Sequence, residues 1–272
     1  LLIETRAPKR TLILGPTYSE YSRELSFSGS TQDYYHLQEA EDFELDVEDL
    51  CRTLLNGYDF LILCNPNNPT SSAILKDEMR ALLSFCANRD IFVMIDETYV
   101  EFAPSVQEVT AVPYTKDFSN LMVLRGVSKF YAAPGMRFGY GITGNKEFLS
   151  QMKEKQIPWS LNSLGAYAGE QMFKDTSYIR QTRALILTER DRMFLELKKM
   201  SSFKVYFPYG NFILVKILKP EVTSFDVFEA CIKEGLMIRD CSSFQCLDGE
   251  FIRFCIMKPE DNNRLLKVLK TI

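Results

Sequence analysis

The segment from Leu121 to Gly144, LMVLRGVSKFYAAPGMRFGYGITG, carries a lysine, a hydroxyl and an arginine on a loop between two apolar runs. Ser128 and Lys129 follow the first run, and Arg137 precedes a glycine-punctuated run that returns as a second strand. A lysine amine can condense with an aldehyde to form an imine. A neighbouring hydroxyl and guanidinium can bind a phosphate. The pattern therefore predicts an anchor for a phosphorylated aldehyde.

Pyridoxal phosphate matches these groups, because it carries an aldehyde and a phosphate on an electron-accepting ring. Lys129 would bind the aldehyde, and Ser128 and Arg137 would bind the phosphate. The alternative is that Lys129 is one of many solvated lysines and that Arg137 caps a turn, since short motifs often occur by chance.

The composition is that of an ordinary globular protein: 272 residues, 46% hydrophobic and 25% charged. The net charge of -4 and the lack of a basic stripe argue against nucleic acid as a partner. No apolar run approaches the length of a membrane span, so no membrane partner is expected either.

The seven cysteines include no C-x-x-C pair and accompany a single histidine, His36. Neither a disulfide framework nor a zinc site fits, and no metal is expected. Free cysteines favour the cytoplasm, and His36, in a polar stretch, is expected to be solvated. The chain starts with Leu1 in place of methionine, and we expect it to be the remainder of a longer protein.

Strands alternate with helices through residue 144. A strand at 11–14 ends at a glycine-proline turn, a helix follows from Thr17, and residues 28–44 are expected to be a loop with room for one short strand. Tyr18 then lies at the carboxyl end of a strand, where open α/β sheets bind ligands. It would stack on a flat ring, unless it only packs against the start of the helix.

Two further strands end at polar side chains. A helix at 46–57 leads to the buried strand 59–64 and the loop NPNNPT, where Asn68 would point its amide at a ligand oxygen or serve the turn alone. The strand 91–95 ends at Asp96, a costly place for a carboxylate unless it meets a cation or donors. Asp96 is a candidate partner for a protonated pyridine nitrogen, although a helix cap would also explain it.

The pattern changes at a long charged helix expected at 177–200. Helices of this length often bridge domains, so we predict a large domain at 1–176, with the linking helix and a small α+β domain at 177–272. The expected elements of the small domain are strands at 203–207, 211–216, 236–239 and 251–254 and helices at 224–234 and from Pro259 onward. Arg239 and Arg253, on neighbouring strands, could converge on one anion, although a single arginine of this kind more often lies on the surface.

The order of these residues resembles the fold-type I pyridoxal phosphate enzymes of the aspartate aminotransferase superfamily, over essentially the whole chain. The resemblance implies a three-layer α/β large domain with a mostly parallel sheet, a small α+β domain, pyridoxal phosphate and a homodimer. Lys129 of SKFYAAPGMRFGYG would be the imine lysine and Asp96 of DETYVEF the partner of the ring nitrogen. The implied contacts of the rest of the cofactor are those of Asn68 and Tyr99 with the phenolic oxygen, Ser128 and Arg137 with the phosphate, and Tyr18 with the ring face.

Two branches of the superfamily are similar to this chain: the threonine-phosphate decarboxylases of cobalamin synthesis and the histidinol-phosphate aminotransferases. NPNNPT and DETYVEF suit both. KFYAAPGMRFGY with Pro134, IPWSLNSL, and LMIRDCSSF followed by Arg253 favour the decarboxylase. The predicted substrate is therefore a small phosphorylated amino acid bound by Arg239, Arg253 and Asn68, and the aminotransferase is the alternative.

The chain departs from these relatives in places. Gly126 stands where many have a serine or threonine, and Ser71 where a glycine is usual. Relatives also carry a preceding helix start whose NH groups bind the phosphate, so we expect an incomplete phosphate site and a weakly held cofactor. A non-catalytic ligand sensor would need no imine-forming lysine, and a nucleotide-binding protein would need a glycine-rich phosphate loop that the chain lacks.

Overall fold

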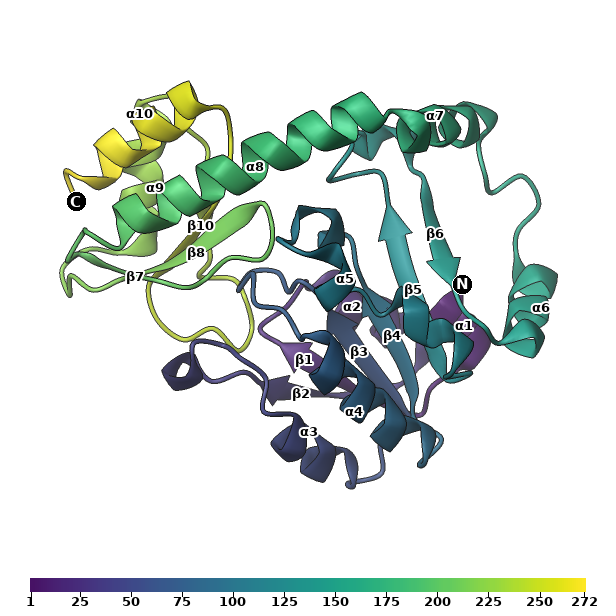
Figure 1. Ribbon diagram of the computed structural model, residues 1–272. Helices are drawn as coiled ribbons and strands as arrows, with labels where there is room; N and C mark the ends of the chain where they lie inside the picture. Colours follow the sequence, from purple (N-terminus) through teal and green to yellow (C-terminus); the bar gives the residue numbers. More distant parts are fainter.

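The computed structural model describes residues 1–272 and contains two sheets (Figure 1). The larger sheet has six strands in the order β2-β1-β3-β4-β5-β6. Its strands are β1 (Arg10–Gly15), β2 (Thr31–His36), β3 (Phe60–Cys64), β4 (Phe92–Asp96), β5 (Leu121–Gly126) and β6 (Gly139–Ile142). All pairings are parallel except that of β6 with β5. The predicted mostly parallel sheet is confirmed.

Helices cover both faces of this sheet and make three layers. In β3, Phe60 and Ile62 enter one hydrophobic core, whereas Leu61 and Leu63 enter a second core on the opposite face. This explains why the strand reads as a continuous apolar run. The first core includes side chains of α1 (Leu2–Arg6), α2 (Glu20–Ser28) and α6 (Lys146–Lys155), and the second includes those of α3 (Val47–Leu54) and α4 (Lys76–Ala87).

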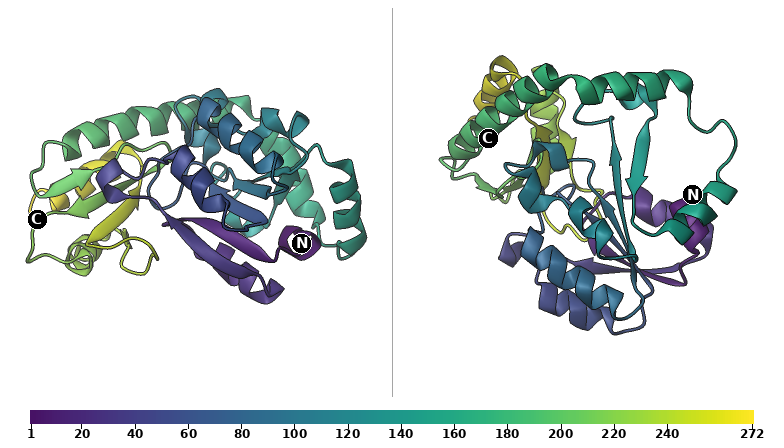
Figure 2. Two further views of the ribbon diagram at one scale, coloured as in Figure 1. Left: turned by 90° about the horizontal axis from the view of Figure 1, so that it is seen from below. Right: turned by 45° about the vertical axis from the view of Figure 1, so that its right-hand side comes forward.

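The smaller sheet is antiparallel, with the order β7-β8-β10-β9. Its elements are β7 (Phe203–Val205), β8 (Phe212–Ile217), α9 (Ser224–Lys233), β9 (Arg239–Asp240), β10 (Phe251–Cys255) and α10 (Pro259–Leu269). The helix α8 (Thr176–Leu197) follows α7 (Ser163–Lys174) and runs along the molecule to this sheet (Figure 2). A domain boundary at residue 176 stays a prediction.

Two local predictions need correction or refinement. The strand expected at 236–239 is wrong in extent, because β9 contains only Arg239–Asp240. Leu236 and Ile238 are apolar because they are buried in the core, not because they pair in the sheet. Residues 28–44 contain a six-residue strand, β2, and His36 at its end is exposed, as expected.

A buried arginine fastens α8 to the rest of the molecule. The Arg190 guanidinium donates from Nη1 to the carbonyl oxygens of Phe102, Tyr209 and Gly210, at 2.9, 3.1 and 3.2 Å. Burial lowers its pKa. Ser71 makes a second link, since its hydroxyl accepts a hydrogen bond from the Gly210 N–H. The φ of Ser71 is 62°, a conformation that favours glycine.

Glu39 joins the outer edge of the large sheet, next to β2, to the small sheet. It lies in the turn Glu39–Glu41 after β2 and accepts hydrogen bonds from Lys204, Tyr206 and Lys216 of the β7–β8 region. Burial alone would raise the pKa of Glu39, but the bonds from Lys216, Tyr206 and Lys204 outweigh it and lower the pKa to about 2. The carboxylate therefore stabilises the fold only while it is ionised.

Replacing Glu39 with glutamine is expected to lower the free energy of unfolding at pH 7 by about 1–2 kcal/mol, a value reduced by the partial exposure of the side chain. The lowered pKa sets the sign: the contribution is complete above the ordinary value of 4.5 and is lost as the pH falls toward about 2. Thermal unfolding at pH 7 and near pH 2.5 measures the difference, which should shrink to about a quarter at the acidic value, because Glu39 is still partly ionised just above its pKa of about 2. Glu20→Gln, which breaks an exposed pair with Arg23, is the matched control. An equal loss at both pH values would contradict the ionic role.

Among the helices, none is both long and apolar enough to cross a membrane. All seven cysteines are unpaired.

Candidate active site

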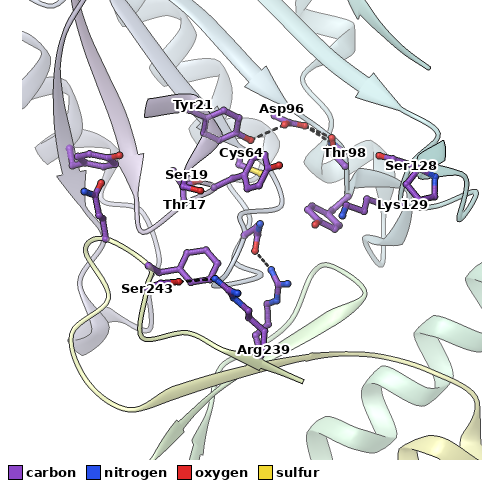
Figure 3. Close-up of a pocket in the computed structure, with 18 of the residues that line it drawn as sticks. Thr17, Ser19, Tyr21, Cys64, Asp96, Thr98, Ser128, Lys129, Arg239 and Ser243 are labelled. Carbon is purple, nitrogen blue, oxygen red and sulfur yellow. Dashed lines mark hydrogen bonds between the residues drawn. The ribbon is translucent and has the colours of Figure 1, made fainter. Parts of the chain in front are cut away.

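A cavity of about 590 Å³ is lined by residues of both sheets and the loops that follow their strands (Figure 3). All nine residues singled out in the sequence line it: Tyr18, Asn68, Asp96, Tyr99, Ser128, Lys129, Arg137, Arg239 and Arg253. The structure therefore brings together every predicted site residue.

Parallel pairing explains this convergence in the large sheet. Cys64 pairs with Asp96, and Asp96 pairs with Leu124, so β3, β4 and β5 reach their carboxyl ends at the same edge. The loops that carry Asn68 and Lys129 leave from that edge. Open α/β sheets bind their ligands in this position.

Asp96 is held by donors on both of its carboxylate oxygens. The Tyr21 hydroxyl donates to Oδ2 at 2.8 Å, and the backbone N–H of Thr98 donates to Oδ1 at 2.9 Å, with the Thr98 hydroxyl also on Oδ1. Burial raises the pKa of Tyr21 well above its ordinary value, and the nearby Asp96 and Cys64 raise it further. Tyr21 therefore stays protonated and remains a donor.

Lys129 lies on the loop after β5, and its side chain is accessible from the cavity. Its Nζ is 5.9 Å from the centroid of the Tyr99 ring. Tyr99 itself is buried, and burial raises the pKa of its hydroxyl, which therefore stays protonated and can donate. Ser128, beside Lys129, is half-buried.

Gly126 lies where the backbones of β5 and β6 approach each other closely. Gly126 pairs with Gly139 across the β5–β6 ladder. A Cβ on Gly126 would lie 3.3 Å from the Phe138 carbonyl oxygen, and one on Gly139 would lie 3.1 Å from the Arg125 carbonyl oxygen. A side chain at either position would require the facing backbone to move by a few tenths of an ångström, next to the Lys129 loop.

Arg137 and Tyr18 lie at the open side of the cavity. Arg137 has a φ of 50°, and its guanidinium donates to the Pro134 carbonyl oxygen at 3.1 Å. Both Arg137 and Tyr18 are exposed, and the Tyr18 ring meets the Tyr21 ring edge-on at 5.7 Å between centroids. Both side chains remain accessible to a ligand.

Arg239 and Arg253 lie directly opposite each other on β9 and β10. Arg239 donates to the Ser243 hydroxyl at 2.7 Å, and Arg253 donates to Asn68 Oδ1. The Nε of Arg253 is buried without a partner. Like charges opposite each other destabilise a sheet, so this pair is best satisfied by an anion between the two guanidinium groups.

An ion pair that no sequence pattern indicated lies beneath the site. Glu97 is fully buried and accepts hydrogen bonds from Arg125 at 2.7 and 3.0 Å. Burial raises the pKa of Glu97, and Arg125 opposes that rise. Because Glu97 follows Asp96 and Arg125 lies on the strand that leads to Lys129, the pair ties the two functional strand ends together.

Comparison with known proteins gives the family. The model for aminotransferase class I and II matches residues 3–269. The chain belongs to this family. Its class I aminotransferases and related decarboxylases depend on pyridoxal phosphate.

Relatives from both predicted branches are found. The chain is 30% identical to a threonine-phosphate decarboxylase from Salmonella typhimurium, over 97% of this chain and 71% of that protein. It is also 30% identical to a histidinol-phosphate aminotransferase from Methanococcus aeolicus, over 94% of this chain and 67% of that protein. The crystal structure of the histidinol-phosphate aminotransferase from Clostridium acetobutylicum matches with a TM-score of 0.92 and 32% identity, over 99% of this chain and 79% of that one.

Proposed function

We propose that the protein is a pyridoxal phosphate-dependent decarboxylase that converts L-threonine O-3-phosphate to 1-amino-2-propanol phosphate and carbon dioxide, a step of cobalamin synthesis. The observation that carries this proposal is the facing pair Arg239 and Arg253, in the same cavity as Lys129 and Asp96. Two guanidinium groups match a phosphate dianion.

The residues present fit pyridoxal phosphate. Lys129 offers an amine for the aldehyde, Asp96 a doubly hydrogen-bonded carboxylate for the ring nitrogen, and Tyr99 a protonated phenol for the ring oxygen. Asn68 would assist Tyr99, Ser128 and Arg137 would hold the phosphate, and Tyr18 would cover a ring face. When bound, the cofactor supplies a ring that accepts the electron pair of a broken bond.

The chain's own residues would bind the substrate, orient the bond that breaks and deliver a proton. Arg239 and Arg253 would bind the substrate phosphate and so fix which bond of the α carbon is positioned to break. For decarboxylation this must be the bond to the carboxylate, which breaks as carbon dioxide leaves. Lys129 would then deliver a proton to the α carbon.

Histidinol-phosphate aminotransferase is the second candidate, supported by the Clostridium acetobutylicum structure and by the Methanococcus aeolicus relative. Its substrate also carries a phosphate for the arginine pair, but an aminotransferase needs an amino-group acceptor. Carbon dioxide release from threonine phosphate without 2-oxoglutarate would support the decarboxylase. Conversion of histidinol phosphate only with 2-oxoglutarate, and no carbon dioxide from threonine phosphate, would establish the alternative.

We also propose that the protein is a cytoplasmic homodimer. Unpaired cysteines support the location. Exposed apolar side chains before and within α7 support the dimer, including Trp159, which is 96% exposed, Leu164 and Tyr167. Analytical ultracentrifugation should show a dimer that Leu164→Glu weakens, and a monomer at all concentrations would contradict this proposal.

A further inference from the structure

The hydroxyl of Tyr21 has no part in the roles proposed above, although it lies in the same cavity. Tyr21 is the second residue of α2, and its side chain is only 8% exposed. Its hydroxyl reaches Asp96 Oδ2, at the end of β4, and so joins a helix to a strand end (Figure 3). The hydrogen bond connects residues 75 apart in the sequence, so it depends on the tertiary fold and not on local structure.

Thr98 provides the hydrogen bonds to the other oxygen of the same carboxylate. Its N–H and hydroxyl both donate to Oδ1, so each oxygen of Asp96 has at least one protein donor. Rotation of the Asp96 carboxylate would break these bonds. The carboxylate is nevertheless only half-buried, so it still faces the cavity.

We propose that Tyr21 and Thr98 are positioning residues that hold Asp96 as an oriented carboxylate for the ring nitrogen of pyridoxal phosphate. This inference rests on the cofactor role proposed for Asp96. Neither residue is assigned a contact with the reacting atoms, and both act through Asp96. A carboxylate that is already oriented loses little conformational freedom when it binds a protonated ring nitrogen, so binding is tighter. The raised pKa of Tyr21 keeps its hydroxyl a donor throughout the working pH range.

Tyr21→Phe removes the hydroxyl and keeps the ring, which belongs to the hydrophobic core on that face of the sheet. Thr98→Val removes the hydroxyl donor on the other oxygen and serves as a second variant if Tyr21→Phe does not fold. Tyr58→Phe is the matched control, because the Tyr58 hydroxyl also donates to an aspartate, Asp33 Oδ2, at 3.0 Å. Tyr58 lies before the start of β3, at the opposite end of the strand from the cavity.

The experiment compares two cofactors, pyridoxal phosphate and its 1-deaza analogue, which has carbon in place of the ring nitrogen. Spectroscopic titration gives the Kd of each for wild type and variants. Tyr21→Phe and Thr98→Val are expected to raise the Kd of pyridoxal phosphate about tenfold and to leave that of the analogue within about twofold, as for partners of a ligating group. Tyr58→Phe should change neither.

An equal loss of affinity for both cofactors would overturn the inference, because the hydroxyls would then act on the cavity and not through the ring nitrogen. Unchanged affinity for both would overturn it as well. A wild-type protein that binds pyridoxal phosphate while the variants show no nitrogen-dependent loss rejects only this inference. A wild-type protein that binds neither cofactor rejects the proposed function and this inference with it.

Discussion

Lys129→Ala is expected to lower turnover of threonine phosphate by about four orders of magnitude, since the residue would serve both as covalent anchor and as proton donor. The variant keeps the loop but removes the only lysine that lines the cavity. Steady-state rates with excess pyridoxal phosphate measure the loss. Lys146→Ala, at the exposed start of α6, is the matched control and should leave the rate unchanged.

A second measurement tests the bond itself. Borohydride reduction of wild type mixed with pyridoxal phosphate should attach the cofactor to the peptide that contains Lys129, and the variant should not be labelled there. A label on another lysine, with turnover retained in Lys129→Ala, would reject the assignment.

The strand ends of the large sheet were predictable because each strand can be recognised from the residues of its own segment. The apolar runs before Asn68, Asp96 and Lys129 became β3, β4 and β5, and parallel strands meet at one edge. Placing these side chains in one cavity therefore required only the order of strands and helices. An apolar run does not mark a strand before β9, because Leu236 and Ile238 are apolar through core packing alone.

Contacts across elements were not predictable. Tyr21 lies only three residues after Tyr18, at the start of the helix that follows β1, and this closeness in sequence was the available signal. Its hydrogen bond to Asp96 depends on how α2 crosses the sheet, which no local pattern encodes. The Glu97–Arg125 pair was missed for the same reason: it joins β4 to β5 through side chains on different strands.

The neighbouring arginines are an intermediate case. Their types and separation predicted adjacent strands, but that Arg239 directly faces Arg253 depends on the register of β9 against β10. The loop between the two strands also supplies Ser243 to the cavity. An uncompensated facing pair of cations would weaken the sheet, and an anion between them would relieve the repulsion.

Replacing Arg239 or Arg253 with alanine is expected to raise KM and lower kcat for threonine phosphate together, by about 10²-fold in kcat/KM for each. Charge-assisted hydrogen bonds contribute about 1.5–3 kcal/mol, and a tenfold rate change corresponds to about 1.4 kcal/mol. Both parameters change because the phosphate grip also sets which bond at the α carbon faces the ring. Arg23→Ala, which breaks an exposed pair with Glu20, is the control.

The two arginines should also behave as one site. Since they would hold the same phosphate, the double variant should lose less than the product of the single losses. Arg253→Lys should fail to restore the rate, because lysine cannot reproduce the planar fork whose Nε is buried without a partner. Labelling of Lys129 by pyridoxal phosphate and borohydride should persist in every variant, which separates substrate binding from cofactor binding.

Multiplicative losses would mean that the arginines hold different groups. The same losses for histidinol phosphate, with 2-oxoglutarate required and no carbon dioxide from threonine phosphate, would assign the phosphate grip to the aminotransferase reaction.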